Sequence, residues 1–109
     1  MLVLFDNGTP RTLARFLIDR HTVTEARSHG WAESENGDLI AAAEAAGFEV
    51  LVTTDKNITY QQKLSGRKIA IVVLGKGRWS LIKSRVPQVV AAVNAATPGS
   101  YAEVDIPYE

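Results

Sequence analysis

Short apolar runs alternate along this sequence with longer segments in which apolar residues recur at helical spacing. Four runs are rich in β-forming residues and bounded by polar or turn-forming residues, which predicts strands. Three of them are continuous apolar runs, one of which is closed by Thr53, as is typical of a parallel sheet covered on both faces. The predicted strands span residues 2–5, 22–25, 50–53 and 69–74.

The segment after the first predicted strand has the features of a helix that packs on the sheet. Thr9 followed by Pro10 is a common helix start, because Thr caps the first N–H groups and proline suits the first helical position. Apolar residues at i, i+3 and i+4 then form one face. We expect the buried face to contain Leu13, Phe16 and Leu17.

Three further helices are predicted downstream. One spans residues 36–46 and ends at Gly47, since glycine readily adopts the left-handed conformation that follows many helices. A short one begins at Asn57, a capping residue, and runs to residue 64. The last is interrupted by Pro87, so it is either kinked there or begins near Val86. The inward residues of the first are Leu39, Ile40 and Ala43, and those of the last are Ile82, Val86, Val89, Val90 and Val93.

Four rounds of strand and helix predict an α/β fold with a parallel sheet and right-handed crossovers. A chain of 109 residues most simply forms one domain, which we assign to residues 1–96. Residues 97–109 form a tail with only weak apolar alternation at Ala102, Val104 and Ile106. Such a tail adds an edge strand, docks on a partner or stays mobile, and the pattern leaves all three open.

Two of the predicted strands are followed closely by an aspartate. Asp6 follows the first strand in "FDNG", and Asp55 follows the third in "TTDKN". Ligands of an open parallel sheet bind beyond the carboxyl ends of its strands, so both acids could face one solvated cleft. Asp38 opens the second predicted helix, where the helix dipole explains an acid as well as metal binding does. Oxygen ligands without cysteine favour Mg²⁺ or Mn²⁺ over Zn²⁺.

Composition excludes several classes of chemistry. The net charge is zero, so no global basic field indicates nucleic-acid binding, although a local basic surface is compatible with it. The absence of cysteine removes disulfides, thiolate metal sites and thiol catalysis. The apolar fraction of 46% and charged fraction of 22% are ordinary for a globular protein. The first strand leaves no room for a leader, and no apolar run approaches a membrane span of about 20 residues. We therefore expect a soluble cytoplasmic protein.

The ordered set of motifs resembles a known family. "LVLFDNGTPRTLARFL" followed by "NGDLIAAAEAAGFEVLVTTDKN" is similar to the small PIN-like domain family labelled DUF5615. Its members typically begin with a strand ending in Asp-Glu-Asn or Asp-Asn and a Leu/Arg-rich helix. An acid then opens the next helix, and a later strand ends in "TxDxD". The resemblance covers roughly residues 2–74. It implies a three-layer α/β/α PIN-like sandwich with a central parallel sheet of about four strands.

The resemblance also implies an activity. PIN-domain ribonucleases, including toxins of toxin–antitoxin pairs, use acidic residues with Mg²⁺ or Mn²⁺. Asp6 matches the first acid, Asp38 the acid on the second helix and Asp55 the first acid of "TxDxD". These three are therefore the candidate catalytic and metal-binding residues. The partners considered are RNA as substrate, an antitoxin protein and a second copy of the chain in a homodimer, but no membrane.

Four residues near these acids are candidate substrate-binding residues. Asn7 stands where many members have Glu, and Asn57 stands where the second acid of "TxDxD" is usual. An amide binds a metal less strongly than a carboxylate, so both departures weaken the expected site. Arg11 and Lys56 lie close in sequence to the acids, where a phosphate backbone would pass. A solvated surface explains these two basic residues equally well.

Other residues have simpler interpretations. His21 and His29 are the only histidines, and neither has the further ligands that zinc requires. Trp31 and Trp79 are suited to stacking on a base, but packing under a loop is more common. The stretch "GKGRW" at residues 75–79 lacks the spacing of a phosphate loop and predicts a tight turn.

Three functions compete. The preferred one is a metal-dependent nuclease, in which the ion activates a water for attack on phosphorus. The second is a catalytically weak or inactive interaction or regulatory module acting through a protein partner, which the missing fourth carboxylate favours. The third is a receiver-like phosphoacceptor presenting Asp55. A receiver needs paired acids after the first strand and a fifth strand with a lysine, and the sequence predicts neither.

Overall fold

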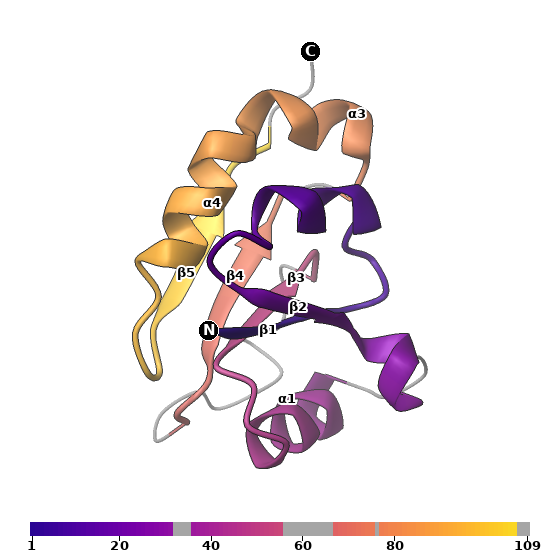
Figure 1. Ribbon diagram of the computed structural model, residues 1–109, viewed down its shortest axis with the longest axis vertical. Helices are drawn as coiled ribbons and strands as arrows, with labels where there is room; N and C mark the ends of the chain where they lie inside the picture. The colour runs from indigo at the N-terminus through magenta and orange to yellow at the C-terminus, as the bar shows by residue number, and fades with distance from the viewer. Residues whose placement is uncertain (32–35, 56–66, 76, 107–109) are drawn as a thin grey trace.

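Five parallel strands form a single sheet in the order β2-β1-β3-β4-β5 (Figure 1). The computed structural model describes residues 1–31, 36–55, 67–75 and 77–106. Within these residues the strands are β1 (Leu2–Phe5), β2 (Thr22–Glu25), β3 (Val50–Thr53), β4 (Ala70–Leu74) and β5 (Tyr101–Val104). The α/β class and the parallel sheet predicted from the sequence are thus confirmed.

The fifth strand comes from the C-terminal tail. β5 pairs with β4 in parallel, from Ile71 opposite Tyr101 to Leu74 opposite Val104. Val104 and Ile106 are buried in the same core as the other strands. Of the three options that the sequence left open for this segment, an edge strand is the one observed. The expectation of about four strands was therefore one too few.

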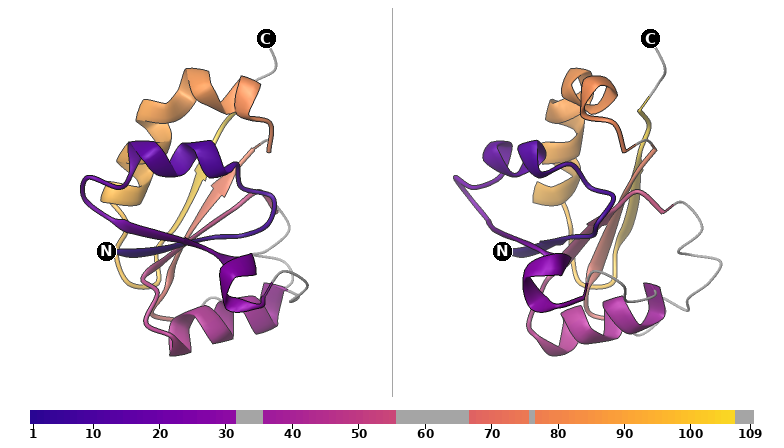
Figure 2. Two further views of the ribbon diagram at one scale, coloured as in Figure 1. Left: turned by 45° about the vertical axis from the view of Figure 1, so that its right-hand side comes forward. Right: turned by 90° about the vertical axis from the view of Figure 1, so that its right-hand side faces the viewer.

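The apolar side chains divide between the two faces of the sheet. On one face, α1 (Asn36–Ala45) packs against alternate strand residues such as Leu4 and Leu51. On the other, η1 (Arg11–Phe16), a 3₁₀ helix, and α4 (Val86–Asn94) pack against Phe5 and its neighbours. Figure 2 shows α1 on one side of the sheet and η1 with α4 on the other. β3 and β4 are buried along their whole length and β1 along all but its first residue, which explains why these three strands are the most apolar.

Helix α1 matches its prediction closely. Leu39, Ile40 and Ala43 are buried, and Gly47 follows the helix with a φ of 92°. The N–H of Phe48 donates to the carbonyl of Ala43, and that of Gly47 donates to Glu44. This is the hydrogen-bond pattern of a Schellman motif, and it sets the direction in which the chain enters β3.

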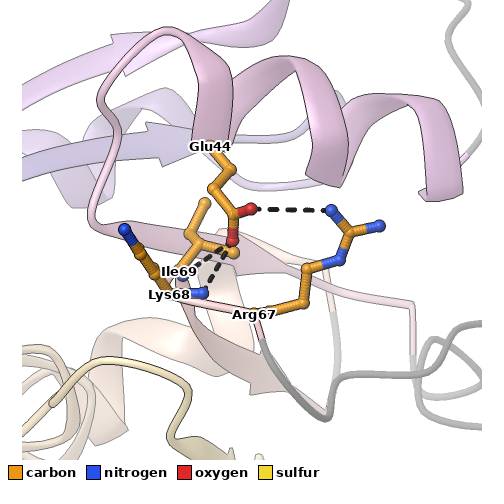
Figure 3. Close-up of polar contacts among 4 residues, drawn as sticks. All are labelled: Glu44, Arg67, Lys68 and Ile69. Atoms are coloured by element: carbon orange, nitrogen blue, oxygen red, sulfur yellow. Dashed lines mark hydrogen bonds and ion pairs between the residues drawn. The ribbon is translucent and has the colours of Figure 1, made fainter.

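A second link joins α1 to the start of β4. Glu44 Oε2 accepts hydrogen bonds from the backbone N–H groups of Lys68, at 2.7 Å, and Ile69, at 3.3 Å. Its Oε1 lies 3.6 Å from Nη1 of Arg67 (Figure 3). These contacts hold the pKa of the Glu44 carboxyl below its ordinary value, chiefly through the two backbone donors.

The segment after β1 differs from the expected helix. It is the 3₁₀ helix η1, in which Leu13 and Leu17 pack inward but Phe16 is 47% exposed. The prediction that Phe16 is buried was therefore wrong. Its ring instead stacks on Trp79, with ring centroids 5.8 Å apart, because the start of α3 (Trp79–Ile82) lies beside η1.

The remaining helices refine the predicted pattern. α4 begins at Val86 with Pro87 in its first turn, which confirms the second of the two readings offered for that proline. The 3₁₀ helix η3 (Lys83–Arg85) separates it from α3. A short 3₁₀ helix, η2 (Ala26–His29), was not predicted. The helix predicted from Asn57 to residue 64 lies outside the described residues. Within the described chain, no helix has the length and apolarity to cross a membrane.

Candidate functional site at the carboxyl ends of β1 and β3

The strand order places a topological switch point between β1 and β3. From β1 the chain continues to β2, toward one edge of the sheet, and from β3 it continues to β4, toward the opposite edge. In open α/β sheets this is where ligands bind, outside the carboxyl ends of the two strands. Asp6 directly follows β1, and Asp55 lies two residues beyond the end of β3. Both sequence-predicted acids therefore flank the switch point.

The carboxylate of Asp6 is held by donors from its own loop and from β3. Oδ1 accepts the N–H of Gly8 at 3.1 Å and the hydroxyl of Thr9 at 2.8 Å. Oδ2 accepts the hydroxyl of Thr53. The backbone N–H of Asp6 also donates to the carbonyl of Val52 at 3.1 Å, which extends the ladder between the strands. Asp6 is therefore fixed relative to the end of β3.

Thr53 connects the two aspartates. It is fully buried at the end of β3, where its hydroxyl donates to Asp6 and accepts the backbone N–H of Asp55 at 3.1 Å. A single hydroxyl thus orients the first acid and the turn that carries the second. Asp55 itself is half-buried. This pairing joins residues 47 positions apart in the sequence.

The hydrogen bonds leave Asp6 limited capacity for a further ligand. An ionised carboxylate offers about four acceptor positions. Described residues approach three of them, two on Oδ1 and one on Oδ2, although the single proton of the Thr9 hydroxyl is shared between Oδ1 and the carbonyl of Val52, 2.9 Å away. One position on Oδ2 remains, which suits single-oxygen coordination of a cation. Mg²⁺ commonly uses only one or two carboxylates, together with waters and substrate phosphates.

Three loops meet closely above the switch point. A Cβ added to Gly8 would overlap the Thr54 hydroxyl oxygen, and one added to Gly77 would lie 3.1 Å from the carbonyl oxygen of Gly8. The loops after β1, β3 and β4 can approach this closely because two of the contacting residues are glycines. The site is therefore built on a packed floor rather than on extended loops.

Asp38 is less closely associated with the other two acids. It lies exposed in the first turn of α1, beside the buried Leu39 and Ile40. Strand alternation places the Asp6 and Thr53 side chains on the face of the sheet that α1 covers, together with Leu4 and Leu51. Among the described residues, however, no three acidic or histidine side chains form a group that could hold a metal. The structure thus links Asp6 with Asp55 but does not complete the predicted trio.

The candidate substrate-binding residues have different positions. Arg11 is on η1, with its side chain 76% exposed, and its Nε lies 3.3 Å from Oε2 of Glu25. Glu25 pairs in register with Phe5, whose side chain faces η1 rather than α1. Asn7 is exposed in the turn after Asp6. Lys56 and Asn57 lie outside the described residues.

Three polar residues at this edge were not predicted from the sequence. Thr53 and Thr9 orient Asp6, and Glu25 ends β2 beside the switch point. The sequence held a signal for two of them. Thr53 and Glu25 are polar residues at the ends of predicted strands, the same kind of position that drew attention to Asp6 and Asp55. No local signal identifies Thr9, because its contact depends on how the turn folds back over the end of β1.

The aromatic residues considered for substrate contact pack against other side chains. His29 stacks on Trp31, with ring centroids 4.6 Å apart, and both rings meet Phe48 edge-on. Trp79 stacks on Phe16. His21 contacts Asn94, with Nε2 2.7 Å from Oδ1. The packing interpretation of the two tryptophans, which the sequence favoured, is therefore confirmed.

Comparisons of this chain with known protein families, curated proteins and solved structures found no match. Membership of the PIN-like family is therefore a proposal, supported by the motifs and the strand-end geometry of the chain itself.

Proposed function

We propose that this protein is a metal-dependent nuclease of the PIN-like class, with an α/β/α sandwich and Mg²⁺ or Mn²⁺ as its cofactor. One observation carries the proposal. Asp6 and Asp55 flank the switch point between β1 and β3, where the Thr53 hydroxyl ties one to the backbone of the other. A structural role alone does not require two acids at the one position where this type of sheet binds ligands.

The donor set suits a hard divalent cation. Carboxylate oxygens are available, cysteine is absent from the chain, and one acceptor position on Asp6 Oδ2 has no donor among the described residues. A bound ion would supply the positive charge that activates water and stabilises in-line displacement at phosphorus. Asp6 and Asp55 would hold it, and Asp38, at the start of α1, would add negative charge from the same face of the sheet. Asn7 and Asn57 would orient a water or the substrate.

RNA is the proposed substrate, and a toxin role with an antitoxin partner is the proposed biological setting. Both follow from the resemblance of the strand-end motifs to PIN-like ribonucleases. Arg11 and Lys56, which are close to the acids in sequence, would steady phosphates of the bound strand, since cationic side chains offset the repulsion between acids and a polyanion. Cytoplasmic location accords with such a substrate.

A second candidate is a binding module on the same fold, acting through a protein partner without catalysis. The hydrogen bonds of Asp6 favour it, because a carboxylate that accepts three donors from its own chain has a sufficient structural role. The lack of a three-acid group among the described residues points the same way. Metal binding separates the candidates, because a binding module has no need of a cation.

The receiver-like candidate has the fifth strand that it requires but lacks the lysine and the paired acids. A fifth strand was not expected, yet β5 is present, and the order β2-β1-β3-β4-β5 is the one found in flavodoxin-like and receiver folds. β5 reads Tyr-Ala-Glu-Val, so the expected lysine is missing from it. Asp6 is followed by Asn7 rather than by a second acid. We therefore prefer the nuclease.

Cleavage of a labelled single-stranded RNA in Mn²⁺ tests the proposal. We expect the wild-type protein to cleave it and Asp55→Asn to lose at least about 100-fold in rate, because a charge that supports the transition state is removed. Asp19→Asn is the matched control, since Asp19 is an exposed acid on a different loop. Equal activity of the wild type and Asp55→Asn, or no metal-dependent cleavage by the wild type, would overturn the proposal.

A further inference from the structure

A hollow lies between η1 and β2 on the face of the sheet opposite α1. Its volume is about 590 Å³, and it is open to solvent along one side. Phe5 forms part of its floor, so the hollow begins one residue before Asp6 in the chain. Its polar lining consists of Arg11, Thr12, Arg15, Thr24, Glu25 and Ser28.

The charges around the hollow are unbalanced toward the positive. Two arginines line it against one glutamate. Glu25 Oε2 lies 3.3 Å from Arg11 Nε, whereas Arg15 has no carboxylate partner within the described part of the chain. Arg11 and Arg15 are four residues apart on η1, and both are exposed. An anion entering the hollow would meet, at Arg15, a guanidinium that no described carboxylate neutralises and, at Arg11, one paired with Glu25.

The lining also indicates how a ligand would be bound. The hydroxyl of Thr12, which is exposed on η1, can donate to a phosphate oxygen, whereas Ser28 already donates to the carbonyl of Glu25 at 2.7 Å. Among the described lining residues the aromatic one is Phe5, which is fully buried and offers no face for base stacking. Binding would therefore depend on phosphate charge and show little preference among bases.

We propose that this hollow binds the phosphodiester backbone of a single-stranded nucleic acid and leads that strand to the acids at the switch point. The choice of ligand rests on the proposed function, while the anionic chemistry follows from the lining. Glu25 acts as an internal counterion that a phosphate displaces from Arg11. Removing the Glu25 charge should therefore strengthen binding. The same change also removes the repulsion between the Glu25 carboxylate and an anionic ligand.

Binding of a fluorescein-labelled oligouridylate of about ten nucleotides, measured by anisotropy in EDTA, tests this site without metal or catalysis. We expect Arg15→Gln to weaken binding about fivefold and to reduce the slope of log K against log salt by about 0.7, the value for one phosphate contact on a single strand. Glu25→Gln should bind more tightly than wild type. Arg20→Gln, which removes an exposed arginine that does not line the hollow, should bind as wild type does.

Two results would overturn the inference. One is unchanged affinity in both Arg15→Gln and Arg11→Gln, with folding verified by circular dichroism. The other is weaker binding by Glu25→Gln. An acidic peptide of equal charge is added as competitor, and competition equal to that of unlabelled RNA would also count against a phosphate site. Failure of the nuclease is distinguishable, because arginine-dependent binding in EDTA without cleavage in Mn²⁺ would keep this site and reject only the catalytic proposal.

Discussion

At the scale of single residues, one buried hydroxyl organises the candidate site. Thr53 is inaccessible to solvent, and both of its hydrogen bonds go to the segments that carry Asp6 and Asp55. A buried hydroxyl is costly unless it is paired, and here the pairing also fixes the position of two acids. The sequence indicated the aspartates because they follow apolar runs. The sequence did not indicate that the Thr53 hydroxyl connects the two aspartates, because this connection depends on which strands become neighbours.

Gly8 permits the close contact between the loops after β1 and β3. We expect Gly8→Ala to lower the free energy of unfolding by about 1–3 kcal/mol, because the new methyl group overlaps the Thr54 hydroxyl and forces repacking. This outweighs the gain of at most about 1 kcal/mol from a less flexible unfolded chain. Urea denaturation measures the change.

The same substitution in a Thr54→Ala background provides the control. Removing the Thr54 hydroxyl removes the overlap, so most of the cost should disappear, and the coupling energy of the double-mutant cycle reports the contact. An equal cost in both backgrounds would show that something other than this contact requires glycine.

At the scale of secondary-structure elements, local sequence predicted α1 better than η1. Gly47, with its left-handed φ, and the buried face of α1 both followed from local sequence. The η1 segment has the same kind of start signal and apolar spacing, yet it forms a 3₁₀ helix with Phe16 exposed. Stacking on Trp79, more than sixty residues away, is a tertiary contact that helical spacing cannot anticipate.

Glu44 ties α1 to the start of β4 by charge. Because its pKa is lowered in the folded state, the stabilisation is present above the ordinary value of 4.5 and is lost as pH falls through the folded-state pKa. We expect Glu44→Gln, which keeps the shape and one acceptor oxygen, to be less stable than wild type at pH 7. The difference in unfolding free energy should shrink as pH falls below about 4.5.

Thermal or urea unfolding of both proteins at several pH values measures that difference. Asp19→Asn serves as a control for general acid effects, since Asp19 is an exposed acid away from this contact. A difference between Glu44→Gln and wild type that grows toward acid pH would contradict the assigned role of Glu44.

At the scale of the whole molecule, the ends of the strands could be predicted from the sequence, but the order of the strands in the sheet could not. Buried strands of a parallel sheet are apolar on both faces, so β1, β3 and β4 stood out in the sequence. β5 did not, because an edge strand needs fewer buried positions, and only Val104 of its four residues is buried. The strand order then decides which polar ends meet, and it brings Asp6 beside Thr53 and Glu25 beside Phe5.

The sheet thus presents different chemistry on its two faces at one edge. The acids Asp6 and Asp38 belong to the face that α1 covers, whereas the Arg11–Glu25 pair belongs to the face beneath η1. In the proposed binding mode, a strand would pass from the hollow around this edge to the acids. The hollow has an excess of positive charge, two arginines against one glutamate, in a chain whose net charge is zero.

Calorimetric titration of Mn²⁺ into the purified protein tests the central claim most directly. The proposed nuclease requires a cation held by Asp6 and Asp55, whereas a purely structural role of these two acids requires none. We expect the wild type and Asp19→Asn to bind with a millimolar or lower Kd, about −4 kcal/mol or better, and Asp55→Asn to lose at least about tenfold in affinity. Absence of Mn²⁺ binding by the wild type, or equal binding by Asp55→Asn, would contradict the metal site and favour the interaction module.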